Sequence, residues 1–501
     1  MFRRQLLCLS SLVAMCAAAP AVAQVTPEQV WDNWRSILDT AGYQVTVAGE
    51  TRSGDTLTLS GVLLQMAAEG NRATVPLGTV RMRDRGDGSV EITMDPEYRI
   101  DMRTENPDQD PVEMTLSLRQ PGLGMIASGR PGAMRYDYTA PEFRVELERM
   151  TVKDEAVPMT FVVEMGGLSG FYMSGGADGR DLSASVRTDR ADVELEATNP
   201  EGAGRVAVAI QMEAIAGDFS GRLIENLGAY QELSGAFAAG FRMEGDYGAG
   251  RTQFSIDAEE AQGQTAIRGE IAETTVGIGM NADRLRYKVG AKGLDLTLSG
   301  DTIPVPEINV TAAEYGIGIL LPVAETGEPA DFEALLRVVD LALPDDIWGM
   351  FDPMGAMPRD PATLILDARG KLLVLADLFS PETAQSGAPP FAVEAVDLTE
   401  LRVKAIGAEL TGAGAFTFDN DDLETFDGMP RPTGAVDLTL VGGNALIDRL
   451  VSMGMLPQDQ AMGARMMMGL FGRPGAGEDT LTSRIEVTPD GAVLANGQRI
   501  Q

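Results

Sequence analysis

The stretch Phe143-Arg144-Val145-Glu146-Leu147-Glu148 places an apolar side chain at every second position and a charged side chain at each position between. Successive side chains of a β-strand point to opposite faces of a sheet, so this pattern predicts a strand with one apolar and one hydrated face. The same alternation is found in five further segments, 114–118, 193–196, 254–257, 294–298 and 436–440. Turn-forming residues separate such runs at hairpin distances, as in Gly86-Asp87-Gly88, Asp178-Gly179 and Asp490-Gly491. We therefore predict a mainly β protein of the α+β type, with a long, curved, mostly antiparallel sheet and a few capping helices.

A helix is expected before the first strands. Thr26 suits the N-cap position, Gln29 completes a capping box, Pro27 suits the first helical position and Gly42 suits the C-terminal end. One face of this helix is apolar and carries Val30, Trp31, Trp34, Ile37 and Leu38. Such a face is typical of a helix that packs against one end of a sheet, and the alternative is an aromatic contact with a membrane or a partner.

Other segments show helical spacing or turn composition. Residues 219–237 place Leu223, Ile224 and Leu227 on one helical face, and residues 331–339 do the same with Phe332, Leu335, Leu336 and Val339. Near the end, 444–453 and 457–471 predict a helical hairpin joined through 454–456, followed by a closing strand pair over 484–494. Residues 380–390 are rich in Ser, Gly, Ala and Pro, which predicts a surface loop.

The N-terminal segment has the features of a secretory signal peptide. Arg3 and Arg4 precede an apolar run over residues 6–19, and Ala21-Val22-Ala23 is the small-x-small pattern that signal peptidase accepts. We expect cleavage between Ala23 and Gln24 and export to the periplasm, with a retained anchor or a lipoprotein at Cys16 as the alternatives. The expected organisation is a signal peptide over 1–23, an N-terminal β-rich half over 24–218 and a C-terminal β-rich half with helical insertions over 219–501.

The composition narrows the possible functions. The formal net charge is −34, which opposes binding to nucleic acid and electrostatic docking on anionic lipid. The 501 residues include no histidine, so histidine-based catalysis and imidazole-ligated metal sites are excluded. Both cysteines, Cys8 and Cys16, lie in the segment that is expected to be removed, so no disulfide is expected in the mature protein.

Three clusters of side chains are candidate sites. A methionine cluster, Met462, Met466, Met467 and Met468, has the thioether ligands that copper(I) prefers, but a helix core or groove lining needs the same side chains. An acidic cluster, Asp419, Asn420, Asp421 and Asp422, lacks the spacing of a calcium loop and predicts a solvated loop. The pair Asp345 and Asp346 has no feature that separates it from a chance pair among 74 acidic residues. We predict no catalytic, cofactor-binding or metal-binding residues and no cofactor.

Three stretches resemble a known bacterial family. They are residues 31–42, the segment Leu343-Pro344-Asp345-Asp346-Ile347-Trp348 with Asp352-Pro353 and Pro358-Arg359-Asp360-Pro361, and the ending Asp490-Gly491 with Asn496-Gly497. Together they are similar to the domain-of-unknown-function 2125 family of secreted bacterial proteins. The family has no assigned activity, so the resemblance implies no functional residues.

A looser likeness concerns residues 404–456. There Ala408-Glu409-Leu410-Thr411-Gly412-Ala413-Gly414 precedes a Pro-Gly turn, a strand and a short helix, and this order resembles AsmA-like envelope proteins. That resemblance implies a curved sheet with a concave apolar groove, associated with lipid handling or outer-membrane upkeep. Similarity of fold does not by itself assign a function.

The expected function is therefore that of a non-enzymatic periplasmic protein, a binding or structural module of the cell envelope. The expected partners are lipid acyl chains or an envelope protein, and the sequence does not determine the oligomeric state. An outer-membrane β-barrel is the first alternative, because alternating strands and many glycines also suit one. A hydrolase that works through carboxylates alone is the second alternative.

Overall fold

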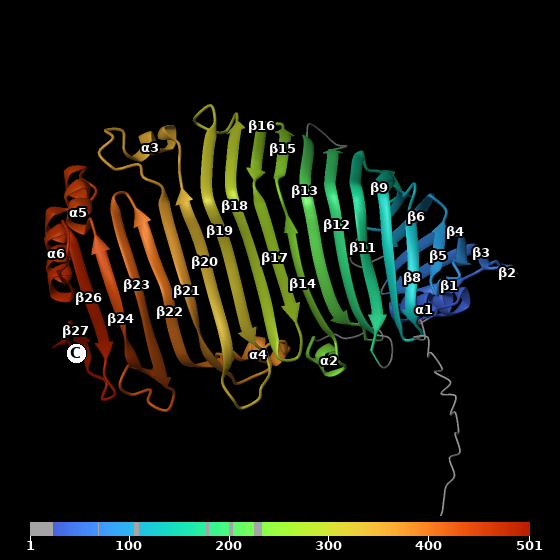
Figure 1. The fold of residues 1–501 in the computed structure, drawn as a ribbon. Coiled ribbons are helices and arrows are strands. Elements are labelled where there is room, and N and C mark those ends of the chain that lie inside the picture. The colour runs from blue at the N-terminus through green and yellow to red at the C-terminus, as the bar shows by residue number, and fades with distance from the viewer. Residues whose placement is uncertain (1–23, 69, 105–109, 177–179, 200–203, 225–232) are drawn as a thin grey trace, which may run out of the picture.

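The computed structural model describes residues 24–501 except 69, 105–109, 177–179, 200–203 and 225–232. The described strands form one long sheet in which each paired strand is antiparallel to its neighbour (Figure 1). The predicted fold class, a mainly β protein with a long curved sheet and a few helices, is confirmed. In the described residues, no helix has the length and apolar character needed to cross a membrane.

The N-terminal end of the sheet begins with a helix and eight strands. Helix α1 (Pro27–Thr40) has the predicted capping box, in which the Thr26 hydroxyl accepts from the Gln29 amide and Gln29 Oε1 accepts from the Thr26 amide. The strands that follow are β1 (Gln44–Thr46), β2 (Gly49–Ser53), β3 (Thr56–Ala68), β4 (Asn71–Asp84), β5 (Val90–Met94), β6 (Glu97–Thr104), β7 (Val112–Arg119) and β8 (Gly124–Arg130). The predicted turn at 86–88 joins β4 to β5, whereas Asp178-Gly179 lies outside the described residues.

The middle of the sheet consists mostly of long strands. They are β9 (Ala133–Val152), β10 (Glu155–Ala156), β11 (Met159–Gly175), β12 (Asp181–Thr198), β13 (Gly204–Arg222), β14 (Arg242–Ala249), β15 (Thr252–Glu260), β16 (Gly263–Ile271), β17 (Glu273–Met280), β18 (Arg284–Gly300), β19 (Ile308–Pro322) and β20 (Ala330–Leu341). Shorter strands lie end to end beside the long ones: β14 and β15 both pair with β13, and β16 and β17 both pair with β18. The sheet therefore keeps a nearly constant width.

The C-terminal part completes the sheet and adds most of the helices. Its strands are β21 (Ala362–Val374), β22 (Phe391–Ala405), β23 (Ala408–Asp419), β24 (Arg431–Val441), β25 (Arg473–Pro474), β26 (Thr480–Val487), β27 (Val493–Ala495) and β28 (Gln498–Arg499). The helices outside α1 are α2 (Leu233–Ala238), α3 (Asp345–Phe351), α4 (Pro381–Ser386), α5 (Gly443–Ser452) and α6 (Gln458–Phe471). The predicted helical hairpin is confirmed as α5 and α6, and the predicted closing pair as β26 with β27.

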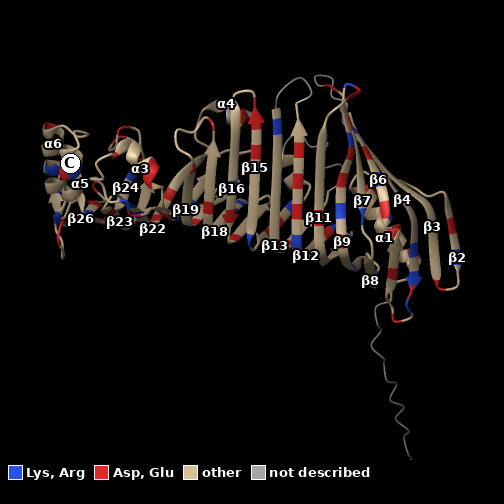
Figure 2. Cartoon of the chain, turned by 90° about the horizontal axis from the view of Figure 1, so that it is seen from above, with Lys and Arg blue, Asp and Glu red and all other residues tan. Residues whose placement is uncertain are grey.

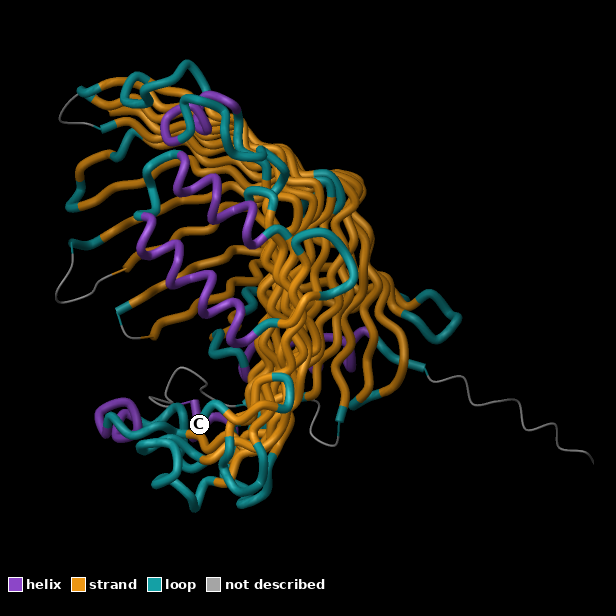
Figure 3. The backbone as a smooth tube through the Cα atoms, turned by 90° about the vertical axis from the view of Figure 1, so that its left-hand side faces the viewer, coloured by secondary structure: helices purple, strands orange, loops and turns teal. Residues whose placement is uncertain are grey.

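Positive-φ glycines bend the strands and keep the apolar side chains on one face. In β3, Leu57 and Leu59 precede Gly61 (φ +62°), and Val62 and Leu64 follow it, yet all four apolar side chains lie in one core. The extra residue is a β-bulge, which shifts the alternation by one position and bends the strand. Gly293 (φ +63°) lies at the equivalent position in β18, between Ala291 and Leu294. Seen from the C-terminal end, the bent strands give the sheet the form of a trough (Figure 3).

The two faces of the sheet differ in chemistry. Cross-strand ion pairs cover one face, for example Arg286 with Asp246 at 3.0 Å and Arg337 with Glu314 at 3.2 Å. The positions of acidic residues (red) and basic residues (blue) recur along the strands in the view from above (Figure 2). Exposed ion pairs of this kind contribute about 1 kcal/mol or less each, so they keep this face hydrated more than they stabilise the fold.

The main core lies at the N-terminal end, where α1 covers the apolar face of β3, β4, β5, β8 and β9. The buried cluster consists of Val25, Val30, Trp31, Trp34, Leu57, Leu59, Val62, Leu64, Val80, Met82, Val90, Ile92, Ala127, Met134 and Tyr136. The prediction that the apolar face of this helix packs on the sheet is thus confirmed for Val30, Trp31 and Trp34.

Two of the predicted helices are wrong. Residues 331–339 belong to β20, which pairs with β19 and β21, so tertiary strand pairing overrides the helical spacing of the apolar residues. In the predicted helix 219–237, residues 219–222 belong to β13, and the helix begins only at Leu233. Leu227 lies outside the described residues.

The segment 380–390 is not wholly a loop, because it contains the short helix α4, capped by the Ser380 hydroxyl. Helices α2 and α4 lie along the lower rim of the sheet in Figure 1. The ring of Phe237 in α2 makes an edge contact with the ring of Phe379, which lies just before α4, and the ring centroids are 5.4 Å apart. Position 219, where the sequence suggests a second half, lies inside β13, which is paired on both sides.

Candidate functional site: an open apolar groove

Two parallel rows of apolar residues cross the sheet at right angles to the strands. Directly paired residues of neighbouring antiparallel strands point to the same face, so each row follows from the strand register. The first row, from β12 to β26, is Val186, Gly217, Tyr247, Val276, Val289, Ile317, Leu336, Leu366, Leu401, Gly412, Leu438 and Ser483. The second is Ala184, Phe219, Gly245, Ile278, Tyr287, Ile319, Ala334, Ala368, Leu398, Gly414, Val436 and Ile485. We call this surface the apolar groove.

The groove is long compared with a small-molecule pocket. Its rows pass through the same strands in the same order, β12, β13, β14, β17 to β24 and β26, and neighbouring strands are about 4.8 Å apart. The rows therefore extend for about 50 Å. Ser483 is the one residue of the two rows with a polar side chain other than the tyrosines, so the surface is apolar over this whole length.

Large side chains in the middle of the groove are open to solvent. Exposed fractions are 45% for Tyr287, 40% for Ile319 and 39% for Leu366. Leu364 and Val403, which lie opposite each other in the next row, are 38% and 40% exposed. A contiguous exposed apolar surface of this extent marks an interaction site in a soluble protein, whereas a single exposed leucine does not.

Glycines allow aromatic rings to lie flat on the groove floor. A Cβ added to Gly217 would come within 3.0 Å of the Tyr247 ring, and one added to Gly245 would come within 3.5 Å of the Phe219 ring. The rings therefore occupy the space above the glycines in the same row. Small residues recur further along, at Ala334, Ala368 and Gly412. These positions keep the floor low and leave room above it.

Helix α1 closes the N-terminal end of the groove. Tyr172, the neighbour of Ala184, stacks on Tyr136 with ring centroids 4.5 Å apart, and Trp34 Nε1 donates to Tyr172 Oη at 2.5 Å. Burial raises the pKa of both Tyr136 and Tyr172 above the ordinary tyrosine value. Both hydroxyls therefore stay neutral, and they serve as hydrogen-bonding groups at a dry end wall.

The α5–α6 hairpin closes the other end. In Figure 3 the two helices lie side by side on the hollow side of the sheet, which places the apolar groove on the concave face. Met468 and Phe471 of α6 cover groove residues of the last strands and enclose a cavity of about 340 Å³. Its other apolar walls are Leu410, Leu438, Leu440, Leu481, Ile485, Val493 and Ile500. A pocket of this volume is within the usual range for small apolar ligands.

Asp479 anchors this hairpin to the sheet. Helix α5 starts after Gly442, which has no side chain to cap it, and the Asp479 carboxylate accepts from the Asn444 and Ala445 amides at 3.2 and 2.9 Å instead. Burial acts to raise the pKa of Asp479, but the hydrogen bonds from Ala445 and Asn444 outweigh it, so the pKa lies below its usual value. The ionised carboxylate also stabilises the positive end of the helix dipole.

We expect Asp479→Ala to loosen α5 by about 1 kcal/mol at pH 7, because it removes a helix cap. Amide hydrogen exchange in α5 should accelerate about fivefold, with little change in β18 to β20. Since the folded pKa is lowered, the anchoring is present above the ordinary carboxyl pKa and is lost as the pH falls through the lowered value. The difference in α5 exchange rate between wild type and variant should therefore become smaller at acidic pH. A difference in exchange rate that does not depend on pH would contradict the anchoring role of the charge.

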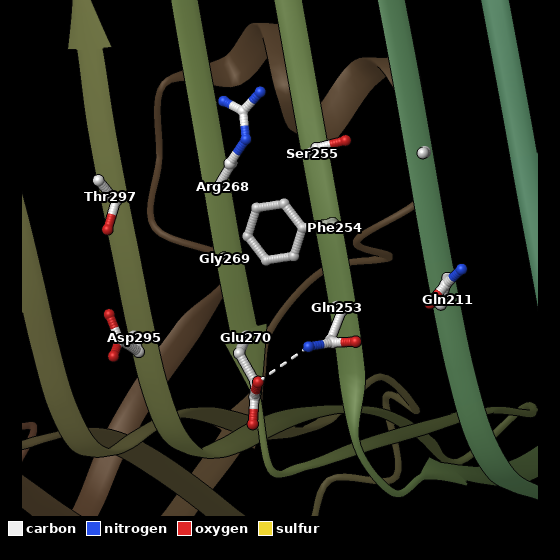
Figure 4. Close-up of a pocket in the computed structure, with 10 residues that line it drawn as sticks. Gln211, Gln253, Phe254, Ser255, Arg268, Gly269, Glu270, Asp295 and Thr297 are labelled. Atoms are coloured by element: carbon white, nitrogen blue, oxygen red, sulfur yellow. Dashed lines mark hydrogen bonds between the residues drawn. The ribbon is translucent and has the colours of Figure 1, made fainter.

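A second hollow lies on the polar face, and its groups satisfy one another (Figure 4). Glu270 accepts from Gln253 at 3.1 Å and from Arg251 at 2.7 Å. Asp295 accepts from Asn309 at 2.7 Å, and Arg268 donates to Asp257. The hollow of about 440 Å³ therefore presents paired polar groups and not a set of convergent free ligands.

The acidic clusters considered from the sequence are held by arginines. Asp419 and Asp422 both pair with Arg431, and hydrogen bonds from Arg431 and from Thr425 lower the pKa of Asp419 and Asp422, respectively. Asp345 at the start of α3 pairs with Arg359. Among the described residues there is no group of three or more histidine, cysteine, aspartate or glutamate side chains arranged to hold a metal ion.

The methionine cluster divides between the two sides of α6. Met468 lines the cavity under the helix, as a groove-lining residue should. For Met462, Met466 and Met467 the same prediction is wrong, because they point to solvent with exposed fractions of 68%, 71% and 49%. Ala461 is fully buried and Met468 lines the cavity over the sheet, whereas the other three methionines lie on the outer side of the helix.

Comparison with known families gives one match. The model of a family described as "Uncharacterized protein conserved in bacteria (DUF2125)" matches residues 226–499, more than half of the chain. This chain belongs to the DUF2125 family. The match includes two of the three stretches on which the resemblance rested, those in 343–361 and 490–497, and it does not include 31–42. No curated protein matches the chain. The looser likeness to AsmA-like proteins stays a prediction.

Most of the groove falls within the family match. Residues 226–499 contain β14 to β28 and both helices of the C-terminal hairpin, but not α1 and its core. The part of the groove from Tyr247 to Ile485 is thus built by the family domain. The sequence alone indicated the one-sided alternation, but it did not indicate which segments lie side by side in a row.

Proposed function

We propose that this member of the DUF2125 family is a non-enzymatic, periplasmic protein of the cell envelope that binds lipid acyl chains in the apolar groove. The observation that carries the proposal is the pair of apolar rows along a concave face, half exposed in the middle and covered by helices at both ends. An extended hydrocarbon chain matches this surface, because it is apolar, narrow and needs no hydrogen-bonding partner. The signal-peptide pattern of residues 1–23 supports the periplasmic location.

The energetics favour long chains. Burial of one methylene group contributes about 0.8 kcal/mol, whereas association itself costs at least about 4 kcal/mol. A chain with few methylenes therefore gains too little to stay bound. We expect fatty acids of sixteen carbons to bind and those of eight carbons to bind at least hundreds of times more weakly, since full burial of eight further methylenes contributes about 6 kcal/mol.

The absence of histidine in the sequence supports a binding role over an enzymatic one, since it removes the commonest general acid and base. In the groove itself the residues of the two rows carry no carboxylate, amine or thiol. Tyr247, Tyr287 and Ser483 supply the hydroxyls there, and the Ser483 hydroxyl donates to the Phe471 carbonyl. The two exposed tyrosines are suited to contact the polar end of a ligand.

The test is the ligand content of the purified protein. We expect the protein isolated from the periplasm without detergent to carry phospholipids or fatty acids that organic extraction and mass spectrometry identify. A folded protein that carries no lipid, and that takes up no sixteen-carbon fatty acid when this is offered, would overturn the proposal. Turnover of an acyl ester by the same preparation would instead favour a carboxylate hydrolase.

A further inference from the structure

The outer side of α6 carries an apolar stripe that faces away from the protein. Met462, Met466 and Leu470 recur every four residues and are 68%, 71% and 51% exposed. Side chains with this spacing lie above one another on one side of a helix. Met467 is also on this helix and is 49% exposed, and Met455 in the turn before α6 is 56% exposed. The side that α6 turns outward is therefore as apolar as the side it turns to the sheet.

The local charge of this surface differs from the strongly negative charge of the whole chain. Residues 443–475 contain three arginines, Arg449, Arg465 and Arg473, and two acids, Asp448 and Asp459, so the segment has a net charge of +1 in a chain of −34. Arg465 pairs with Asp448, which neutralises one of the two acids. The α6 surface therefore repels a phosphate-bearing surface less than the charge of the whole chain would suggest.

The stripe also lies next to the end of the apolar groove. Met468 and Phe471, on the inner side of the same helix, line the cavity over the last strands. A helix with its side chains is about 10 Å across, so a surface that touches the outer stripe lies within about 10 Å of the groove. Long flexible methionines suit a contact with a fluid and variable surface, because they adapt their shape.

We propose that the outer side of α6 docks the protein on a phospholipid bilayer, with Met462, Met466 and Leu470 inserted into the interfacial region. Docking is driven by burial of these side chains, and the low net charge of residues 443–475 permits it. The overall charge of −34 opposes contact between anionic headgroups and the acidic parts of the molecule, whereas α6 offers an exposed apolar stripe of low net charge. The inference extends the proposed function, since it assigns the surface through which a groove ligand would be exchanged.

Vesicle flotation tests the inference. The chain is expressed from Met1 so that processing is native, and the purified protein is floated with vesicles of phosphatidylcholine and phosphatidylethanolamine. We expect the wild type to float with the vesicles and the double variant Met462→Asp/Met466→Asp to lose at least about tenfold in bound fraction. The matched control is Leu423→Asp/Met429→Asp in the loop between β23 and β24, where the replaced side chains are 47% and 63% exposed, and it should float like the wild type.

A second readout does not depend on the charged variants. Met466→Trp should show a blue shift of its fluorescence when vesicles are added, and Met429→Trp should not. A wild type that stays with the bottom fraction, or a double variant that floats like the wild type, would overturn the inference. If an envelope protein co-purifies on the stripe and the chain does not bind vesicles, the membrane assignment is wrong and the surface binds a protein.

The failure of this inference is distinguishable from failure of the proposed function. Uptake of a sixteen-carbon fatty acid in vesicle-free solution reports on the groove alone. The Met462→Asp/Met466→Asp variant should retain this uptake and a normal circular dichroism spectrum, since neither side chain lines the cavity under α6.

Discussion

Replacing Trp34 with alanine is expected to lower the free energy of unfolding of the N-terminal end of the sheet by about 3–5 kcal/mol. The Trp34 side chain is only 9% exposed, and its ring lies 6.2 Å from that of Tyr136. Its removal leaves a cavity between α1 and the sheet, and it also leaves the buried Tyr172 hydroxyl without its donor. Urea unfolding followed by circular dichroism, together with hydrogen exchange in β3 to β9, measures the loss.

Two control variants distinguish the loss of Trp34 packing between α1 and the sheet from a general effect of removing a tryptophan. Trp34→Phe keeps most of the ring volume and loses the Nε1 donor, so it should cost only about 1–2 kcal/mol. Trp348→Ala removes a ring that packs on Phe351 in the short helix α3 and that is only partly buried, so it should cost less than Trp34→Ala. Equal losses for Trp34→Ala and Trp348→Ala would contradict the view that α1 closes the core.

Two charges placed in the middle of the apolar groove should abolish acyl-chain binding. In Ile319→Asp/Leu366→Asp, the new carboxylates are hydrated in the empty protein, because both positions are about two-fifths exposed. A chain laid over them would strip that water, which costs at least about 2 kcal/mol, so affinity should fall about 30-fold or more. Titration with a fluorescent sixteen-carbon fatty acid measures the change.

The matched control adds the same charges to the other face. Ile126 and Val441 are 36% and 41% exposed and pair with Asp137 and Glu409, respectively, on the polar face. Ile126→Asp/Val441→Asp should therefore bind the fatty acid like the wild type. If both double variants bind equally, the ligand does not occupy the groove.

Alternation of apolar and polar residues was enough to predict the sheet, because each strand needs the same one-sided pattern to lie on the concave surface. Helices were harder to distinguish from strands by the spacing of apolar residues alone. In β20, Phe332, Leu335 and Leu336 fit a helical spacing, yet Leu335 pairs with Gly318 and Asp367 on the polar face. This segment is a strand because it pairs with β19 on one side and β21 on the other. Such long-range pairing leaves no local signal in the sequence.

The groove could be anticipated only as an apolar face, since its continuity depends on register. Tyr287 and Ile319 belong to one row because β18 and β19 pair at those residues. The orientation of α6 could not be predicted from the sequence either. Met466 and Met468 are equally apolar, and only the packing of the helix on the sheet decides which of them faces water. The caps at Thr26 and Gln29 were predictable, since they involve neighbours in the chain.

Photo-crosslinking is the measurement that tests the groove most directly. A sixteen-carbon fatty acid with a diazirine near its tail is bound to the protein, irradiated, and located by peptide mass spectrometry. We expect labels on groove residues such as Tyr287, Ile319, Leu366 and Val403, and none on the polar face of the same strands. Labels concentrated on polar-face residues, or no saturable label at all, would contradict the claim that this concave face holds the ligand.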